Sequence, residues 1–216
     1  MMSGLFARTG HYQQQLANWL RVVQPKVMVE TGVERGLSTD AILRVMDEIG
    51  IGHLYSCDPS VGRVNLPDWT AVKHPRWTFN QMTSLMALPR IYKETGPWDV
   101  FLHDSDHDVE CQVLEYSFAY WAVKPGGYIL SDDHTWGSPP HHAWKKFCER
   151  YNLSSQAPLG HCAWVQKPLD DGLFKLSMQA ALSCAVELAH TAAVEYGDKP
   201  KYFLELECSS DGAFSE

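Results

Sequence analysis

The sequence predicts an α/β fold in which a mostly parallel, doubly wound sheet of seven strands carries helices on both faces. Short apolar runs, such as those at 27–29 and 100–102, alternate with longer segments whose apolar residues recur at helical spacing. A turn containing Gly32 and Gly36 follows the first of these runs. Polar clusters follow two of the predicted strands and a single acid ends a third, at the carboxyl edge where parallel sheets bind their ligands.

Length and composition favour a folded globule. The chain has 216 residues, of which 45% are hydrophobic and 20% are charged. We expect one domain over residues 1–168 and a helical extension over 169–216 that packs on the domain or on a partner subunit, which allows a homo-oligomer. The formal charge of −8 disfavours a nucleic-acid partner.

The cysteines and the apolar segments indicate the cellular compartment in which we expect the protein. The six cysteines include no CxxC pair, which disfavours a zinc site and suits reduced thiols in the cytoplasm. The start of the chain lacks the pattern of a signal peptide. The apolar stretch from Leu176 to Val194 carries Glu187 and His190, which does not suit a membrane span. We therefore expect a cytoplasmic protein with no membrane partner.

Periodicity and helix breakers place the elements in order. In the first half we expect a helix over 11–23, a strand over 26–31, a helix over 37–49 capped by Ser38 or Thr39, and strands over 53–58 and 77–80. In the second half we expect a short helix that ends at 95–97, a strand over 100–102, a helix over 109–123 ended by Lys124-Pro-Gly-Gly127, a strand over 128–131, and a helix over 139–151. Strands over 153–157 and 162–166 would complete the sheet, the last one antiparallel, and a helix over 173–196 would follow.

The glycine turn indicates which cofactor the sheet holds. No glycine lies two residues after Gly32, so the turn does not fit the dinucleotide fingerprint, which disfavours a nicotinamide oxidoreductase. The segment from Glu30 through Gly32 to Gly36 resembles motif I of class I S-adenosylmethionine-dependent methyltransferases, with Glu34 in place of the middle glycine. Asp58 ends the second strand, where a carboxylate can accept hydrogen bonds from two ribose hydroxyls, although a turn before Pro59 also explains it.

The polar clusters after the fourth and fifth strands are more specific. Asp104 and His107 lie in the first cluster, and Asp132 and Asp133 follow the fifth strand at a spacing of 132 − 104 = 28 residues. Together with Lys124-Pro-Gly-Gly127, this pattern resembles catechol O-methyltransferase and the macrocin-type sugar O-methyltransferases, over residues 24–168.

The resemblance implies a Rossmann-like fold, a cofactor, a cation and a reaction. S-adenosylmethionine would bind at the strand ends and the loops after them: Glu30, Thr31, Gly32, Gly36, Ser38, Asp58, Thr83 and Asp104. Asp104, Asp132 and Asp133 would hold Mg²⁺, because this ion prefers oxygen ligands and three unpaired carboxylates would otherwise repel one another. His107 would be the general base, since imidazole titrates near neutral pH, and Asp104 is the second catalytic residue.

Two further histidines lie near the predicted site, and two alternative functions are considered. We expect His103 to point into the sheet or to bond the backbone, and His134 to line the acceptor pocket. The predicted activity is O-methylation of a small hydroxylated molecule, such as a sugar or a phenolic ring. The alternatives are a methyltransferase that uses no metal and acts on another acceptor, and a non-catalytic module that only binds the cofactor.

Overall fold

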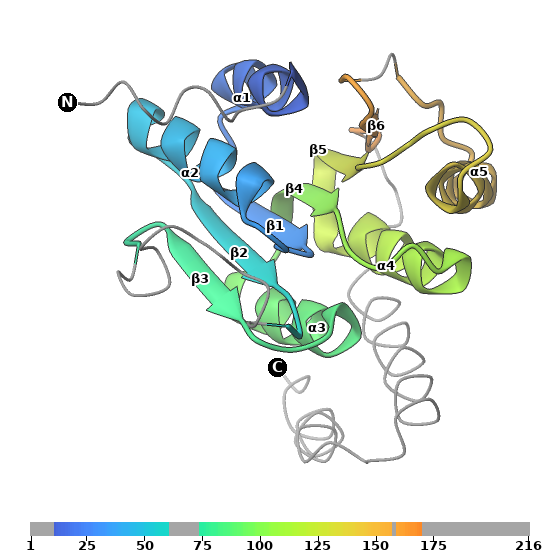
Figure 1. The fold of residues 1–216 in the computed structure, drawn as a ribbon, viewed down its shortest axis with the longest axis horizontal. Coiled ribbons are helices and arrows are strands. Elements are labelled where there is room, and N and C mark those ends of the chain that lie inside the picture. The colour runs from blue at the N-terminus through green and yellow to red at the C-terminus, as the bar shows by residue number, and fades with distance from the viewer. Residues whose placement is uncertain (1–10, 61–73, 157–158, 170–216) are drawn as a thin grey trace.

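The computed structural model describes residues 11–60, 74–156 and 159–169 of the chain (Figure 1). Helices and strands alternate along these residues: α1 (His11–Val23), β1 (Val27–Thr31), α2 (Leu37–Ile49), β2 (His53–Cys57), β3 (Trp77–Asn80), α3 (Ser84–Thr95), β4 (Trp98–His103), α4 (Val109–Ala122), β5 (Val123–Ser131), α5 (Pro139–Tyr151) and β6 (Ala163–Gln166). The expected helix over 173–196 lies outside the described residues, as does the extension beyond Leu169.

The described strands form one sheet in the order β3-β2-β1-β4-β5-β6. The strands from β3 to β5 are parallel, and β6 runs antiparallel to β5. The chain order reverses between β1 and β4, and ligands of open α/β sheets bind beside such a reversal, at the carboxyl ends of the strands. The predicted fold class is therefore confirmed.

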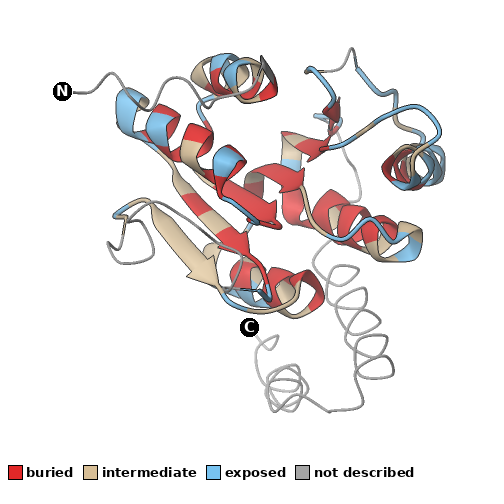
Figure 2. Ribbon diagram, in the orientation of Figure 1, coloured by how far each residue is buried: buried red, intermediate tan, exposed pale blue. Residues whose placement is uncertain are grey.

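Helices cover both faces of this sheet (Figure 1). Helices α1 and α2 pack on one face, in a core that includes Leu16, Ile42 and Leu102. Helices α3, α4 and α5 pack on the other face, in a core that includes Phe101 and Phe147. The inner strands β1, β4 and β5 are mostly buried, whereas every residue of the edge strand β3 is partly exposed (Figure 2).

Two expectations for the second half of the sheet differ most from the structure. Lys124-Pro-Gly-Gly127 was expected only to end a helix, but β5 already starts at Val123 and includes these residues. The pairing of β4 with β5 shifts register between Trp98 and Val100, so the extra residues form an irregularity inside the ladder. Residues 153–156, expected to form a further strand, form none, and a single backbone hydrogen bond from Gln156 N to Trp164 O (2.9 Å) joins them to β6.

Within the part of the chain that the structure describes, no helix has both the length and the apolar composition needed to cross a bilayer.

Candidate active site

Backbone hydrogen bonds extend the ladder of the sheet beyond its strands and hold the site residues in place. Gly32 N donates to Cys57 O (2.8 Å), Asp104 N to Thr31 O (2.8 Å), and Asp132 N to His103 O (2.9 Å). The first residues after β1, β4 and β5 are thus fixed to neighbouring strands. The predicted site residues Gly32, Asp104 and Asp132 consequently share one edge of the sheet.

The glycine loop after β1 packs directly on the residues after β4. Gly32 has φ +81°, and a Cβ added there would lie 1.9 Å from the carbonyl oxygen of Asp104, so only glycine fits. Glu34, which replaces the middle glycine of the resembled motif, takes φ 43° in the same left-handed region. The loop therefore keeps a glycine-like backbone despite the substitution.

The prediction that Ser38 or Thr39 caps α2 is wrong. Gly36, with φ 71°, is the cap residue, and no side chain caps this helix. Both hydroxyls lie inside the first turn and bond to acids: Ser38 Oγ donates to Asp104 Oδ2 (3.4 Å), and Thr39 Oγ1 donates to Glu30 Oε2 (2.7 Å). Since Gly36 adopts the capping position itself, these side chains are left for the neighbouring strands.

Glu30 is buried beneath the loop. Its Oε2 accepts hydrogen bonds from Thr39 and from Ser56 Oγ (2.7 Å), which links β1 to α2 and β2. Burial raises the pKa of Glu30 to about 7 against the effect of these two hydrogen bonds. Its Oε1 is buried without a hydrogen-bond partner among the described residues. The observed contacts of Glu30 are thus those of a residue that supports the loop from below.

Asp58 lies at the end of β2, as predicted, and its carboxylate holds the glycine loop. Oδ2 accepts from Val33 N (2.9 Å) and Glu34 N (3.1 Å), and Oδ1 accepts from Ser60 N (2.8 Å) and Ser60 Oγ (3.1 Å). Burial acts to raise the pKa of Asp58, but the hydrogen bonds from Val33, Ser60 and Glu34 outweigh it and lower the pKa. This carboxylate is therefore held ionised at the edge of the sheet.

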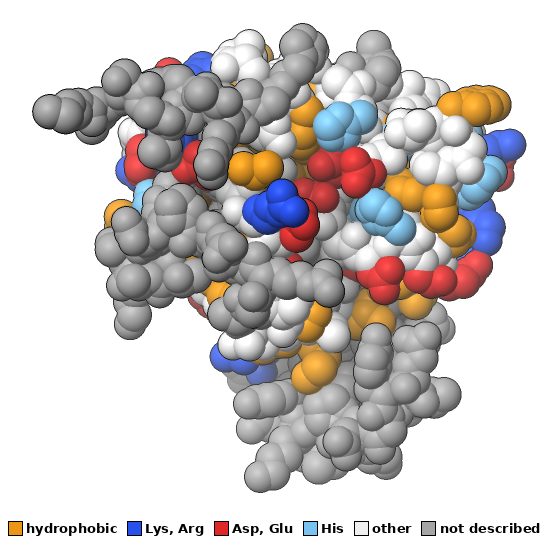
Figure 3. Space-filling model, viewed as in Figure 1, with side chains coloured by type: hydrophobic (Ala, Val, Ile, Leu, Met, Phe, Trp, Pro, Cys, Tyr) orange, Lys and Arg blue, Asp and Glu red, His pale blue; other side chains and the backbone are white. Residues whose placement is uncertain are grey.

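Asp104, Asp132 and Asp133, here named the acidic cluster, lie close enough for their charges to interact. Asp132 and Asp133 belong to a group of described side chains whose ligand atoms all lie within 4.8 Å of one another, and Asp104 does not. Burial, together with the charges of Asp132, Glu30 and Asp133, raises the pKa of Asp104 well above its ordinary value. Burial also raises the pKa of Asp132, while a backbone hydrogen bond at Asp133 and the nearby His161 act against the rise. In Figure 3, acidic side chains gather on the visible face with histidines close to them. Such a cluster is suited to hold a proton or a cation.

Sequence reasoning missed His161, which precedes β6 and joins this cluster. Its Nε2 lies 3.0 Å from Asp132 Oδ1 and 3.9 Å from Asp133 Oδ1. In the antiparallel register of β5 and β6, Ser131 pairs with Ala163. If the same register continues for two more residues, His161 lies opposite Asp133. The sequence predicted that the last strand is antiparallel, but it did not predict the register that brings His161 next to the acids.

His107, the predicted base, lies beside the acids. Its Nε2 is 3.6 Å from Asp133 Oδ2, and the side chain is 47% exposed. The imidazole is therefore reachable both from solvent and from a molecule placed beside Asp133.

His103 is buried, and it bonds a carboxylate rather than the backbone. His103 Nδ1 pairs with Glu115 Oε2 at 2.7 Å, and both side chains are buried. Thr31 Oγ1 donates to the same oxygen (2.7 Å). Burial acts to raise the pKa of Glu115, but the charge and hydrogen bond of His103 and the hydrogen bonds from Ser84 and Thr31 lower it. Thr31 and His103 are thus parts of a buried network between β1, β4 and α4.

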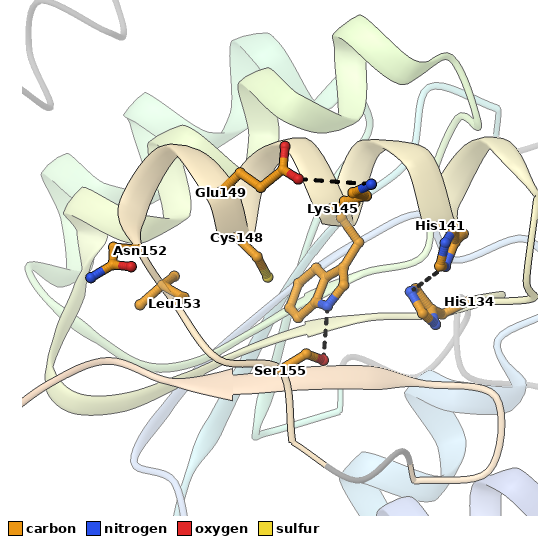
Figure 4. Close-up of a pocket in the computed structure, with 9 residues that line it drawn as sticks. His134, His141, Lys145, Cys148, Glu149, Asn152, Leu153 and Ser155 are labelled. Carbon is orange, nitrogen blue, oxygen red and sulfur yellow. Dashed lines mark hydrogen bonds and ion pairs between the residues drawn. The ribbon is translucent and has the colours of Figure 1, made fainter.

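His134 faces a separate pocket beside α5 (Figure 4). Its Nε2 lies 3.2 Å from His141 Nδ1, and burial followed by the charge of His141 lowers the pKa of His134. The pocket has a volume of about 390 Å³ and is lined by residues of α5 and of the segments on either side of it, none of which belongs to the acidic cluster. Thr83, a predicted cofactor residue, is the cap residue of α3 and lies three residues after β3.

Comparisons with known proteins agree with this geometry. A family model described as a methyltransferase domain matches residues 29–134, which include the glycine loop, Asp58 and the acids. No curated protein sequence matches the chain.

Solved O-methyltransferases share the fold. An O-methyltransferase from Bacillus cereus in complex with SAH is 17% identical, with a TM-score of 0.55 over 72% of this chain and 80% of that one. TomG from Streptomyces achromogenes, involved in tomaymycin synthesis and solved with SAM, is 15% identical, with a TM-score of 0.56 over 72% of this chain and 79% of TomG. MycE from the mycinamycin pathway, solved with Mg, SAH and mycinamycin VI, is 18% identical, with a TM-score of 0.54 over 74% of this chain but 50% of MycE.

The matched segment runs from Val29 inside β1 through β5 and contains both loops that carry the acids. Residues 29–134 therefore match a methyltransferase domain, and the chain has the fold of O-methyltransferases that were solved with SAH or SAM.

Proposed function

We propose that the chain transfers the methyl group of S-adenosylmethionine to a hydroxyl of a small molecule, such as a sugar or a phenolic ring, with the help of a divalent cation. The observation that carries this proposal is the meeting of three carboxylates from two adjacent strand ends beside the glycine loop. MycE, which has the same fold, was solved with Mg and SAH.

The cofactor would bind over the glycine loop, between the ends of β1, β2 and β4. Gly32 lets the loop approach the backbone at Asp104, and Asp58 is a buried carboxylate held close to the same loop. On binding, Asp58 would accept hydrogen bonds from the ribose hydroxyls. Ser38 lies in the first turn of α2, and Thr83 is the cap residue of α3, three residues after β3; both would contact the cofactor from the neighbouring helices.

The surroundings of the acids support a divalent cation. Within the described residues, the ion-pair partners of Asp132 and Asp133 are the histidines His107 and His161, with no lysine or arginine among them. Asp132 Oδ1 is buried and accepts no hydrogen bond there. Asp104, Asp132 and Asp133 would hold Mg²⁺, which when bound lowers the pKa of a coordinated hydroxyl and orients it.

His107 would remove the proton of the acceptor hydroxyl. The proton would move to the imidazole as the oxygen attacks the methyl carbon, the bond from sulfur to that carbon breaks, and S-adenosylhomocysteine leaves as a neutral thioether. Asp133, 3.6 Å away, would stabilise the imidazolium, and the exposure of His107 lets the proton pass to water.

The test is a transfer assay with methyl-labelled S-adenosylmethionine and a panel of sugars and phenols, with Mg²⁺ and with a chelator. We expect label transfer that the chelator abolishes and that His107→Gln reduces by about 10²- to 10⁴-fold. His142→Gln, at an exposed position of α5, is the matched control and should retain full activity. Transfer that persists in the chelator would contradict the role of the cation.

A further inference from the structure

His161 supplies a nitrogen atom to the acidic cluster. One potential ligand atom from each of Asp132, Asp133 and His161 lies within 4.8 Å of the other two. Asp132 is buried, whereas Asp133 and His161 are exposed, so the group opens from the sheet edge toward solvent. This is the arrangement of a cation site that a dissolved ion can enter.

The chain holds His161 in this position through its backbone. Gly160 and His161 form a two-residue turn closed by hydrogen bonds in both directions between Leu159 and Cys162 (2.9 and 3.1 Å), with Gly160 at φ +67°. His134 N donates to His161 O (2.8 Å). The backbone of His161 is thus fixed next to the residues that follow β5, where Asp132 and Asp133 lie.

Helix α1 also packs on the turn that contains Gly160 and His161. The ring of Tyr12 lies 4.4 Å from that of His161, between centroids. A Cβ at Gly160 would lie 3.6 Å from Tyr12 Cα and 3.1 Å from Gln15 Oε1, so α1 packs closely on the turn. Because packing orients the ring, His161 is better placed for a ligand than a freely rotating surface histidine.

Asp132 contributes a buried oxygen that accepts no hydrogen bond from the described residues. The residue is only 7% exposed, and this oxygen, Oδ1, lies 3.0 Å from His161 Nε2. Two atoms that coordinate one octahedral cation at about 2.1 Å, at right angles, are about 3.0 Å apart. A short contact without a directed hydrogen bond is what two ligands of one cation show.

We propose that His161 is a nitrogen ligand of the divalent cation, with Asp132 and Asp133, and that the site therefore prefers Mn²⁺ or Co²⁺ to Mg²⁺. This inference rests on the proposed cation-assisted function and refines it. Mg²⁺ favours oxygen ligands, whereas imidazole suits the transition metals, whose affinities also rise from Mn²⁺ to Co²⁺. Asp104 remains the additional oxygen ligand.

The test titrates the chelator-stripped full chain with MgCl₂, MnCl₂ or CoCl₂ by calorimetry, and follows the visible absorption of bound Co²⁺. We expect wild type to bind Mn²⁺ and Co²⁺ more tightly than Mg²⁺. His161→Gln, which offers an oxygen instead of a nitrogen, should weaken Mn²⁺ and Co²⁺ by about 10- to 100-fold, change the Co²⁺ spectrum, and leave Mg²⁺ nearly unchanged. His142→Gln should behave as wild type.

Binding of S-adenosylhomocysteine to the same samples separates the two proposals. If the cofactor binds but His161→Gln leaves the Mn²⁺ and Co²⁺ affinities and the Co²⁺ spectrum as in wild type, the role of His161 is overturned and the methyltransferase function stands. The absence of any cation binding to wild type would also overturn it. If the cofactor does not bind, the proposed function fails, while the metal titrations still decide whether His161 is a ligand.

Discussion

Gly32 is the residue at which the glycine loop and the acidic cluster meet. Its φ of +81° is unfavourable for any side chain, and a Cβ would also collide with the backbone of Asp104 at 1.9 Å. Gly50 has a similar φ of +74° but open space around it, so it separates the two effects.

We expect Gly50→Ala to cost about 1 kcal/mol of unfolding free energy, from the backbone conformation alone. Gly32→Ala should cost about 1–3 kcal/mol more, because overlapping atoms force the loop or Asp104 to move. Urea unfolding of both variants measures the difference. Equal losses of unfolding free energy would show that a side chain at position 32 does not collide with the backbone of Asp104.

Glu30 makes the stability of the fold depend on pH. Its pKa is about 7 in the folded chain, against an ordinary value of 4.5. Between these values the folded chain binds a proton that the unfolded chain has lost, so stability falls as pH rises through this range, by at most about 1.4 kcal/mol per pH unit. The destabilisation is complete above the folded pKa and absent below the unfolded one.

Glu30→Gln should remove this dependence. The amide oxygen can accept the hydrogen bonds from Thr39 and Ser56, and no charge forms at high pH. We expect the unfolding free energy of the variant, relative to wild type, to improve steadily from pH 5 to pH 7 and then to level off. Chemical denaturation at several pH values, with a chelator present, measures it. A difference that does not vary with pH would contradict the raised pKa.

At the scale of elements, Lys167 joins the end of β6 to the junction of α4 and β5. It is 1% exposed, its Nζ donates to Tyr120 O (2.9 Å) and Val123 O (3.1 Å), and its backbone N donates to Gly127 O (2.8 Å). These contacts fix the strand that follows the turn of His161.

Lys167→Met should lower the unfolding free energy by about 2–3 kcal/mol, because it leaves buried carbonyls without their charged donor. Lys145→Met, on the exposed side of α5, is the matched control and should stay within about 0.5 kcal/mol of wild type. Thermal or urea unfolding distinguishes them. If Lys167→Met loses no more unfolding free energy than the control, the buried contacts of Lys167 do not stabilise the fold.

Over the whole molecule, the sequence predicted the elements well, because their signals are local. Apolar periodicity and helix breakers placed α1, α2, β3 and α5 at the residues where the structure has them. The acids at the ends of β4 and β5 were also predictable, since the carboxyl ends of parallel strands share an edge. Residues 170–216 are not described, so the expected extension stays a prediction.

Contacts between segments that are far apart in the chain could not be predicted from the sequence. The cap of α2 was assigned to Ser38 or Thr39, but these hydroxyls find carboxylates on neighbouring strands instead. His161 was missed because its position depends on the register of β6 against β5. The partner of His103, Glu115, lies on α4 and has no sequence signal of its own.

The central claim is that this sheet edge binds S-adenosylmethionine, and calorimetry of the full chain tests it most directly. S-adenosylmethionine and S-adenosylhomocysteine would be titrated with and without Mg²⁺ into wild type, Asp58→Asn and the control His142→Gln. Asp58→Asn cannot offer two carboxylate oxygens to the ribose and the loop, so we expect binding to weaken by about 10-fold or more while the control binds as wild type. Absence of binding to wild type under every condition would contradict the account and leave only the fold.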